Sequence, residues 1–244
     1  NSKIEIIEKN AFSLSSIESI FIPQKVTSIG KYAFYNCKNL TKIEIGNNSE
    51  LQLICESAFW KSAIKKFFIP RHLTKIKKWA FSDCKNLKKV EFAANSKLEM
   101  IDTYTFHNTK ISSITIPKHV REIEADSFSL CEKLREVKFE ENSELQLIHT
   151  YAFKGSAIEK ISIPQKVTFI GKRSFYECSK LRHLIIPSNS ELRSIDAEAF
   201  IDSSIEYFWI PPSVEYIHCN AFLNCRNLKI IQIDEDFKMN KIDV

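Results

Sequence analysis

The stretch IKKFFIPRHLTKIKKWAFSDCKNL (64–87) is one unit of a pattern that repeats along the chain. Its Phe81 belongs to a column in which phenylalanine recurs at intervals that alternate between 22 and 25 residues. The members of this column are Phe12, Phe34, Phe59, Phe81, Phe106, Phe128, Phe153, Phe175, Phe200 and Phe222. The true period is therefore a pair of repeats, 47 residues long. Because no insertion breaks this register, residues 1–244 are predicted to form a single solenoid of about ten repeats.

Each repeat contains a short run in which apolar and polar residues alternate, as in LTKIEI (40–45) and ISSITI (111–116). Alternation with a period of two is typical of a β-strand that has one buried face. Ten such runs begin at residues 17, 40, 64, 87, 111, 134, 158, 181, 205 and 228. Because successive runs are 23 or 24 residues apart, every strand repeats the direction of the one before it. The sequence therefore predicts a parallel β-sheet.

The rest of each repeat is expected to return the chain to the start of the next strand. In odd repeats a proline ends the strand, as in FFIP (67–70), because proline has no N–H to donate to a ladder. In even repeats a polar turn with a serine does so, as in NNSEL (47–51). The return segment VTSIGKYAF (26–34) favours a short extended piece, then about one helical turn that carries the phenylalanine. The residue before each phenylalanine is small, alanine in seven repeats and serine or threonine in three, which indicates close packing between coils.

The combined pattern L-x-x-I-x-I-P-x-x-V-x-x-I-x-x-x-A-F-x-x-C-x-x-L resembles the BspA-like (Treponema-type) leucine-rich-repeat family, from Ile4 to Ile242. The resemblance implies an α/β repeat solenoid. This would be a leucine-rich-repeat arc with a parallel β-sheet on one face and short strands and single helical turns on the other. Members of the family are commonly large surface proteins of bacteria and parasitic protists, associated with adhesion to host matrix or to other cells. Because the chain starts and stops within a repeat, we expect it to be a fragment of a longer array.

The resemblance implies that the chain is a non-catalytic protein-binding module. The whole protein would be a cell-surface or secreted protein of the adhesion type. Its partner would be a host matrix or cell-surface protein, or another chain of the same organism, bound on the sheet face. The alternative is a cytoplasmic protein-interaction scaffold, which the free cysteines and the lack of a visible secretion signal favour. No apolar run approaches the roughly 20 residues of a membrane span.

The exposed strand column carries the strongest indication of a binding site. The residue between the two inward apolar residues of a strand points out of the sheet, as does the residue two positions earlier. On the last three strands these positions bring together an apolar cluster with two large aromatic residues, and such clusters mark interfaces. The predicted partner site is His183, Ile185, Tyr207, Trp209 and Ile230. Alternatively, these are ordinary exposed apolar residues, or a neighbouring part of the full protein covers them.

Charge is distributed unevenly along the chain. Residues 1–122 carry 20 basic and 11 acidic residues, a net charge of +9, whereas residues 123–244 carry 15 and 19, a net charge of −4. Between Lys61 and Lys89 there are ten basic residues and one acid. This stretch indicates weak polyanion binding, or else only a solvated surface. No aromatic-interleaved groove of the kind found in nucleic-acid binders is expected, so we predict no specific nucleic acid. The candidate anion-binding residues are Lys65, Lys66, Lys88 and Lys89.

Five of the seven cysteines share one column, three residues after the phenylalanine of the even repeats. They are Cys37, Cys84, Cys131, Cys178 and Cys225. Like positions two coils apart are separated by about 10 Å, too far for a disulfide, so these cysteines are predicted to be buried free thiols. Cys55 and Cys219 fall in columns that are otherwise mainly polar and are predicted to be exposed and free. The redox compartment stays undecided.

Residue patterns for catalysis or for metal binding are absent from the sequence. The six histidines form no H-x-x-x-H or H-E-x-x-H pair, so no metal site is predicted. There is no G-x-S-x-G, P-loop or G-x-G-x-x-G motif. We therefore expect no enzyme activity, no catalytic residues and no cofactor.

Overall fold

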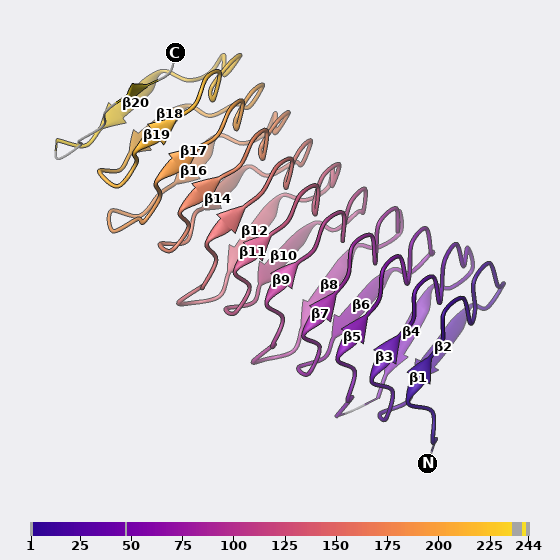
Figure 1. Cartoon of the computed structure of the whole chain (residues 1–244). Helices are drawn as coiled ribbons and strands as arrows, with labels where there is room; N and C mark the ends of the chain where they lie inside the picture. The colour runs from indigo at the N-terminus through magenta and orange to yellow at the C-terminus, as the bar shows by residue number, and fades with distance from the viewer. Residues whose placement is uncertain (1, 47, 236–240, 243–244) are drawn as a thin grey trace.

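The computed structural model describes residues 2–46, 48–235 and 241–242 and shows a solenoid of about ten turns, stacked from one end of the molecule to the other (Figure 1). Each turn has a longer strand on one face, which we call the long-strand face. The strands of this face are β2 (Ser19–Ile22), β4 (Lys42–Ile45), β6 (Lys66–Ile69), β8 (Lys89–Phe92), β10 (Ser113–Ile116), β12 (Glu136–Phe139), β14 (Lys160–Ser162), β16 (His183–Ile185), β18 (Tyr207–Ile210) and β20 (Ile230–Ile233). All their pairings are parallel, as predicted.

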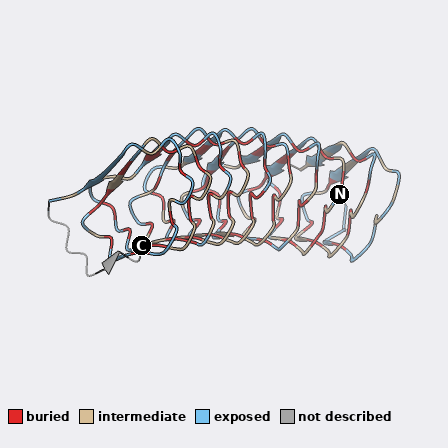
Figure 2. Ribbon diagram, turned by 90° about the horizontal axis from the view of Figure 1, so that it is seen from above, coloured by how far each residue is buried: buried red, intermediate tan, exposed pale blue. Residues whose placement is uncertain are grey.

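The opposite face, which we call the short-strand face, carries strands of two residues. They are β1 (Ile6–Ile7), β3 (Ser28–Ile29), β5 (Leu53–Ile54), β7 (Lys75–Ile76), β9 (Met100–Ile101), β11 (Glu122–Ile123), β13 (Leu147–Ile148), β15 (Phe169–Ile170), β17 (Ser194–Ile195), β19 (Tyr216–Ile217) and β21 (Lys241–Ile242). These strands are the short extended pieces predicted for the return segments, and they also pair in parallel. Buried residues line the inside of the stack between the two faces (Figure 2).

The predicted helical turn around each phenylalanine is wrong, because the described residues contain no helix. Phe34 N donates to Ala58 O in the next coil (2.7 Å), whereas Tyr35 N donates to Tyr32 O in its own coil (3.1 Å). Tyr32 and Asn36 have φ angles of 59° and 53°, in the left-handed region. Positive φ recurs two residues before and two residues after all ten phenylalanines. A helix needs uninterrupted right-handed residues and consecutive i→i−4 bonds, and this backbone has neither. Accordingly, no helix of the described residues could cross a membrane.

The phenylalanine column forms a continuous stack through the centre of the molecule. Neighbouring rings lie 5.0–5.5 Å apart between centroids, with interplanar angles of 2–19°. The inner rings of the stack, from Phe34 to Phe200, are fully buried. One coil cannot bury such a ring by itself, so the stacking of coils is what makes the core continuous.

The five cysteines of the even repeats are buried free thiols, as predicted. Each thiol donates to a phenylalanine carbonyl of the preceding coil, as Cys84 Sγ does to Phe59 O (3.0 Å). A hydroxyl of that coil lies beside it, with Ser62 Oγ 3.4 Å from Cys84 Sγ. Burial raises the pKa of the Cys84 thiol to about 12, so it stays protonated and unreactive at neutral pH. Of the other two, Cys219 is exposed as predicted, but Cys55 is half-buried rather than exposed.

Thiol titration of the native protein should therefore label Cys219 readily, Cys55 more slowly, and the other five cysteines only after denaturation. The physical reason is that burial closes all five thiols to the reagent. Labelling can be followed by intact mass with and without denaturant. Reaction of five or more thiols in the native protein would contradict the assignment of the column to the core.

Candidate functional site

The strands of the long-strand face are joined two by two. β2 and β4, β6 and β8, β10 and β12, and β18 and β20 each pair over four residues, and β14 and β16 pair over three. Between these pairs, only Glu136 and Lys160 join β12 to β14, and only His183 and Tyr207 join β16 to β18. No ladder joins β4 to β6 or β8 to β10, and all these strands lie in the described part of the chain. Every second junction is therefore either open, as between β4 and β6 and between β8 and β10, or held by a single register pair, and we call these four junctions breaks.

Proline accounts for the position of these breaks. Within four of the five pairs, the residue after the second strand donates its N–H to the end of the first, as Gly46 N does to Ile22 O (3.0 Å) and Ala93 N does to Ile69 O (2.9 Å). The exception is the β14–β16 pair, where Pro187 stands at that position. At a break, the corresponding residue is the proline that ends each odd strand, such as Pro70 after β6. Because proline has no N–H, the ladder cannot close at that end.

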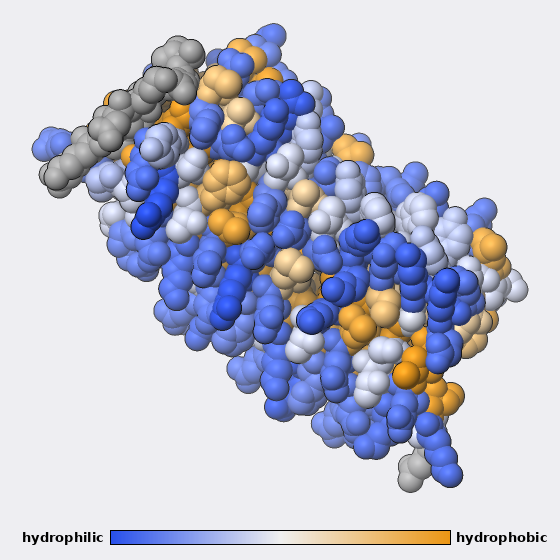
Figure 3. Space-filling view, in the orientation of Figure 1, coloured by the Kyte–Doolittle hydropathy of each residue, from blue (hydrophilic) through white to orange (hydrophobic). Residues whose placement is uncertain are grey.

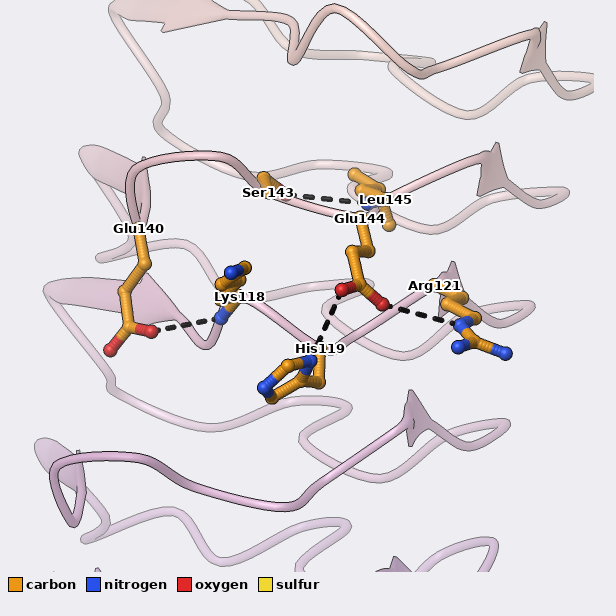
Figure 4. Close-up of polar contacts among 7 residues, drawn as sticks. All are labelled: Lys118, His119, Arg121, Glu140, Ser143, Glu144 and Leu145. Carbon is orange, nitrogen blue, oxygen red and sulfur yellow. Dashed lines mark hydrogen bonds and ion pairs between the residues drawn. The ribbon is translucent and has the colours of Figure 1, made fainter.

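Side chains hold the strand-end turns together across the β10–β12 pair (Figure 4). The Glu144 carboxylate lies between two basic groups of the preceding turn, with Oε1 3.2 Å from His119 Nδ1 and Oε2 3.4 Å from Arg121 Nε. In the same turn Leu145 N donates to Ser143 Oγ (3.3 Å). The serines with this role in the other even turns are Ser49, Ser96 and Ser190. These bonds thus order the even turns and join the two turns of the β10–β12 pair.

Three hollows on the long-strand face lie at these breaks. The largest, of about 930 Å³, lies between β12 and β14 and is lined by apolar Val137, Phe139 and Ile163 together with charged residues. Hollows of about 410 Å³ and 510 Å³ lie at the β8–β10 and β16–β18 breaks. The double repeat therefore produces a series of hollows with the same spacing as the breaks.

The residues of the predicted partner site gather at the break between β16 and β18. Four of them line the hollow of about 510 Å³, and these are His183, Ile185, Tyr207 and Trp209. The fifth, Ile230, is the register partner of Tyr207 and is 57% exposed. Tyr207 and Trp209 point outward, because Phe208 and Ile210 between and beside them are buried. Trp209 is half-buried in this outward column.

The four lysines of the candidate anion site are all exposed and lie at the start of β6 and β8. Lys66 and Lys89 are register partners in the strand pair. Lys89 also pairs with Glu91, with 2.7 Å between Nζ and Oε1, in an ion pair that is open to solvent. Solvent-exposed ion pairs of this kind contribute little to stability, so the Lys89 ammonium and the Glu91 carboxylate both remain available to ions from solution.

Replacing Lys65, Lys66, Lys88 and Lys89 with serine should abolish retention on a heparin column at moderate salt. Exposed charges attract a polyanion additively and are screened by salt, so the loss of four neighbouring charges removes the attraction. A matched control replaces four exposed lysines of the second half, Lys133, Lys138, Lys160 and Lys166. Equal retention of the first variant and the wild type would show that the basic stretch is only a solvated surface.

Comparison with known proteins now decides the family. Residues 5–134 and 99–229 match the model described as "BspA type Leucine rich repeat region (6 copies)". The chain belongs to this family. Among curated proteins, none matches the sequence.

Solved structures share the fold of this BspA-type chain. The pneumococcal vaccine antigen PcpA is 22% identical, with a TM-score of 0.61 over 96% of this chain and 75% of that one. A leucine-rich-repeat protein from Bacteroides ovatus is 20% identical, with a TM-score of 0.53 over 93% and 75%. A leucine-rich cell surface protein from Faecalibacterium prausnitzii is also 20% identical, with a TM-score of 0.52 over 95% and 83%. At these identities the likeness shows the solenoid fold.

The phenylalanine turns of the BspA-type solenoid carry aromatic and basic side chains that were not predicted. The Tyr35 ring lies 5.7 Å from Tyr32 and 5.2 Å from Trp60, and Lys61 Nζ lies 4.7 Å from the Trp60 ring. The signal in the sequence is an aromatic residue that recurs two positions before or one position after the phenylalanine. Because their rings already contact one another and nearby cations, these side chains mainly hold adjacent turns together.

A second unpredicted group consists of Glu122, Glu124 and His149 on the short-strand face. Nε2 of His149 lies 3.2 Å from Oε2 of Glu122 and 3.7 Å from Oε1 of Glu124. Burial raises the pKa of Glu124, and the carboxylate of Glu122 beside it acts in the same direction, whereas the charge of His149 opposes both. A search for closely spaced histidines misses this group, because its members come from two adjacent coils.

Proposed function

We propose that the protein is a non-catalytic module that binds a partner protein on its long-strand face, centred on the break between β16 and β18. The observation that carries this proposal is the cluster around that hollow, where Tyr207 and Ile185 are 42% and 40% exposed beside Trp209. Tyrosine and tryptophan dominate binding energy at protein interfaces, and an exposed apolar patch is typical of a docking site. The opposite, short-strand face is mainly hydrophilic, with small apolar areas (Figure 3).

The rigid strand pairs on either side support this assignment. β14 is bonded to β16, and β18 to β20, while a single register pair joins β16 to β18. A partner side chain that enters the hollow therefore meets a single register pair, His183 with Tyr207, rather than a full ladder. Tyr207 Oη donates to Gln232 Oε1 (2.8 Å), which fixes the aromatic ring before any partner arrives. A preorganised contact residue lowers the entropic cost of association.

The setting we propose is a surface or secreted adhesion-type protein, whose partner is a host matrix or cell-surface protein or another chain of the same organism. The fold is shared with a leucine-rich cell surface protein, and this supports the proposal. The alternative of a cytoplasmic scaffold is favoured by Cys219, an exposed free thiol that a reducing compartment would protect. Surface biotinylation of intact source cells separates the two settings.

The experiment for the binding site compares Trp209→Ala with Phe21→Ala. Both residues lie in the outward column, but Phe21 is on β2 at the other end of the long-strand face and is 57% exposed. Binding to a panel of matrix and cell-surface proteins is measured by surface plasmon resonance, and self-association by light scattering. Trp209→Ala should weaken the detected interaction by about 2 kcal/mol, roughly 30-fold, and Phe21→Ala should not. Equal binding by the wild type and Trp209→Ala would exclude this break as the centre of the site.

A further inference from the structure

Parallel pairing of two short strands brings three potential metal ligands together. β11 and β13 pair with Glu122 opposite Leu147 and Ile123 opposite Ile148. His149 N donates to Ile123 O (2.9 Å), and this bond fixes the backbone on which the imidazole stands. Ile123 is fully buried, so Glu122 and Glu124 on either side of it both project outward from the same strand. The two carboxylates thus face the imidazole of the next coil.

The spacing of the three groups has the size of a metal coordination shell. One ligand atom from each residue lies within 4.8 Å of the other two. In a tetrahedral zinc site with ligand bonds of about 2.0–2.1 Å, neighbouring ligand atoms are roughly 3.3 Å apart. The distances from Nε2 of His149 to the two carboxylates, 3.2 Å and 3.7 Å, bracket that value. A small shift of flexible side chains is all that a zinc ion would require.

The surroundings leave these carboxylates with little other positive charge. The coil before β11 carries Met100 and Asp102 at the positions that correspond to Glu122 and Glu124. The coil after β13 carries Phe169 and Gly171 at the same two positions. No lysine or arginine occupies these flanking positions. The side chains of Glu122, Glu124 and His149 are 39%, 23% and 30% exposed, so water can reach a fourth position. A divalent cation would relieve the repulsion between two neighbouring carboxylates.

The pair formed by His119 and Glu144 provides a contrast. Here too an imidazole faces a glutamate, but the second neighbour of Glu144 is Arg121, which already supplies a positive charge (Figure 4). There is thus one carboxylate rather than two, and it is already satisfied. His119 and Glu144 therefore form an ordinary ion pair, whereas Glu122, Glu124 and His149 form a potential set of metal ligands.

From this geometry we propose that Glu122, Glu124 and His149 bind a zinc ion that links two adjacent turns of the solenoid. One imidazole nitrogen and two carboxylate oxygens are donors that zinc accepts, and the open fourth position takes water. The ion binds the folded protein, in which the two coils are aligned, and therefore stabilises the solenoid by mass action. The site lies on the face opposite the proposed partner surface, so it does not depend on the proposed function.

The test is isothermal titration calorimetry and thermal melting of the tag-free protein with zinc chloride. Cys55→Ser and Cys219→Ser are introduced first, because accessible thiols are competing zinc ligands. We expect binding of one zinc ion per chain and a higher Tm, and no comparable effect of magnesium or calcium, which prefer sites made only of oxygen ligands. An unchanged Tm without any heat of binding would overturn the proposal.

Variants then assign the ligands. His149→Ala and Glu124→Gln should each weaken zinc binding by at least the roughly 10- to 100-fold that loss of a residue supporting a metal ligand causes. His119→Ala is the matched control and should bind zinc like the parent protein. All three replaced side chains are partly exposed, so each variant is expected to fold, which its Tm without zinc verifies. Undiminished zinc binding by His149→Ala would refute the site.

Discussion

Phe208→Ala should lower the free energy of unfolding by about 3–5 kcal/mol, whereas Trp209→Ala, the next residue of β18, should lower it by only about 1 kcal/mol. Phe208 is fully buried, and its ring centroid lies 4.7 Å from that of Phe222 and 6.0 Å from that of Phe200. Removing it leaves a cavity among stiff, stacked rings that cannot collapse into the space. Trp209 lies on the outer side of the same strand, where its removal leaves no enclosed cavity.

Guanidinium unfolding followed by circular dichroism, together with thermal melting, measures both variants. For a chain of this size, 1 kcal/mol corresponds to roughly 2–4 °C, so the two melting temperatures should differ by about 10 °C. A further control is Phe68→Ala, since Phe68 occupies the outward position of β6 and is exposed. It should melt close to the wild type. If Trp209→Ala melted as early as Phe208→Ala, the assignment of inner and outer faces on β18 would be wrong.

The strand faces were predictable because the signal is local and repeated. Alternation in a run such as ISSITI (111–116) already places Ile114 and Ile116 inside and Ser113 and Thr115 outside, and the structure confirms this. The strands begin two residues inside the predicted runs, as β4 does at Lys42. The first residues of each run belong to the bend that enters the strand, so alternation alone does not define its start.

The helical turn was a wrong prediction for a reason that the sequence hides. Residues such as Tyr32 and Trp79 are not typical of the left-handed region, yet both adopt it, with φ of 59° each. Bonds from one coil to the next compensate for that conformation, as when Phe81 N donates to Thr105 O (2.9 Å). A single repeat considered alone contains no such partner. Hydrogen bonds between stacked coils therefore determine the backbone conformation here, rather than the conformational preference of each residue.

The breaks in the long-strand face were only half predictable. Proline was correctly expected to end each odd strand, as Pro70 does. Proline also leaves no N–H to donate to the end of the preceding strand, so the ladder to that strand stays open. This second effect could not be predicted without knowing which strand would have accepted the bond. The hollow beside Tyr207 and Trp209 follows from that break. Alternation brought the right side chains together, but it did not indicate the depression between them.

The acid–histidine group was missed because its members are distant in sequence. Glu124 and His149 are 25 residues apart, which equals one of the two intervals between phenylalanines. Residues at that separation in the same column lie on adjacent coils. Motif searches use spacings within one helix or one turn and do not detect such neighbours. Reading each column across coils would have identified this group.

Ala152→Leu should destabilise the solenoid by roughly 2–3 kcal/mol. Ala152 is fully buried next to Phe153, and its carbonyl accepts the N–H of Phe128 from the preceding coil (2.8 Å). That hydrogen bond sets the distance between the two coils, so added methylene groups must push them apart or leave their preferred rotamers. The same column holds alanine, serine or threonine in all ten repeats.

Ser174→Ala, in the same column of the next coil, is the matched control and should act in the opposite direction. The Ser174 hydroxyl is buried and has no hydrogen-bond partner among the described residues. Removing an unsatisfied buried hydroxyl without adding volume should raise the stability by about 1 kcal/mol. Thermal melting of the two variants side by side therefore compares the effect of added side-chain volume with the effect of a removed hydroxyl at equivalent positions of two coils. A leucine variant that melts like the wild type would show that the coils can separate freely at this contact, and a destabilised alanine variant would show that the hydroxyl has a partner.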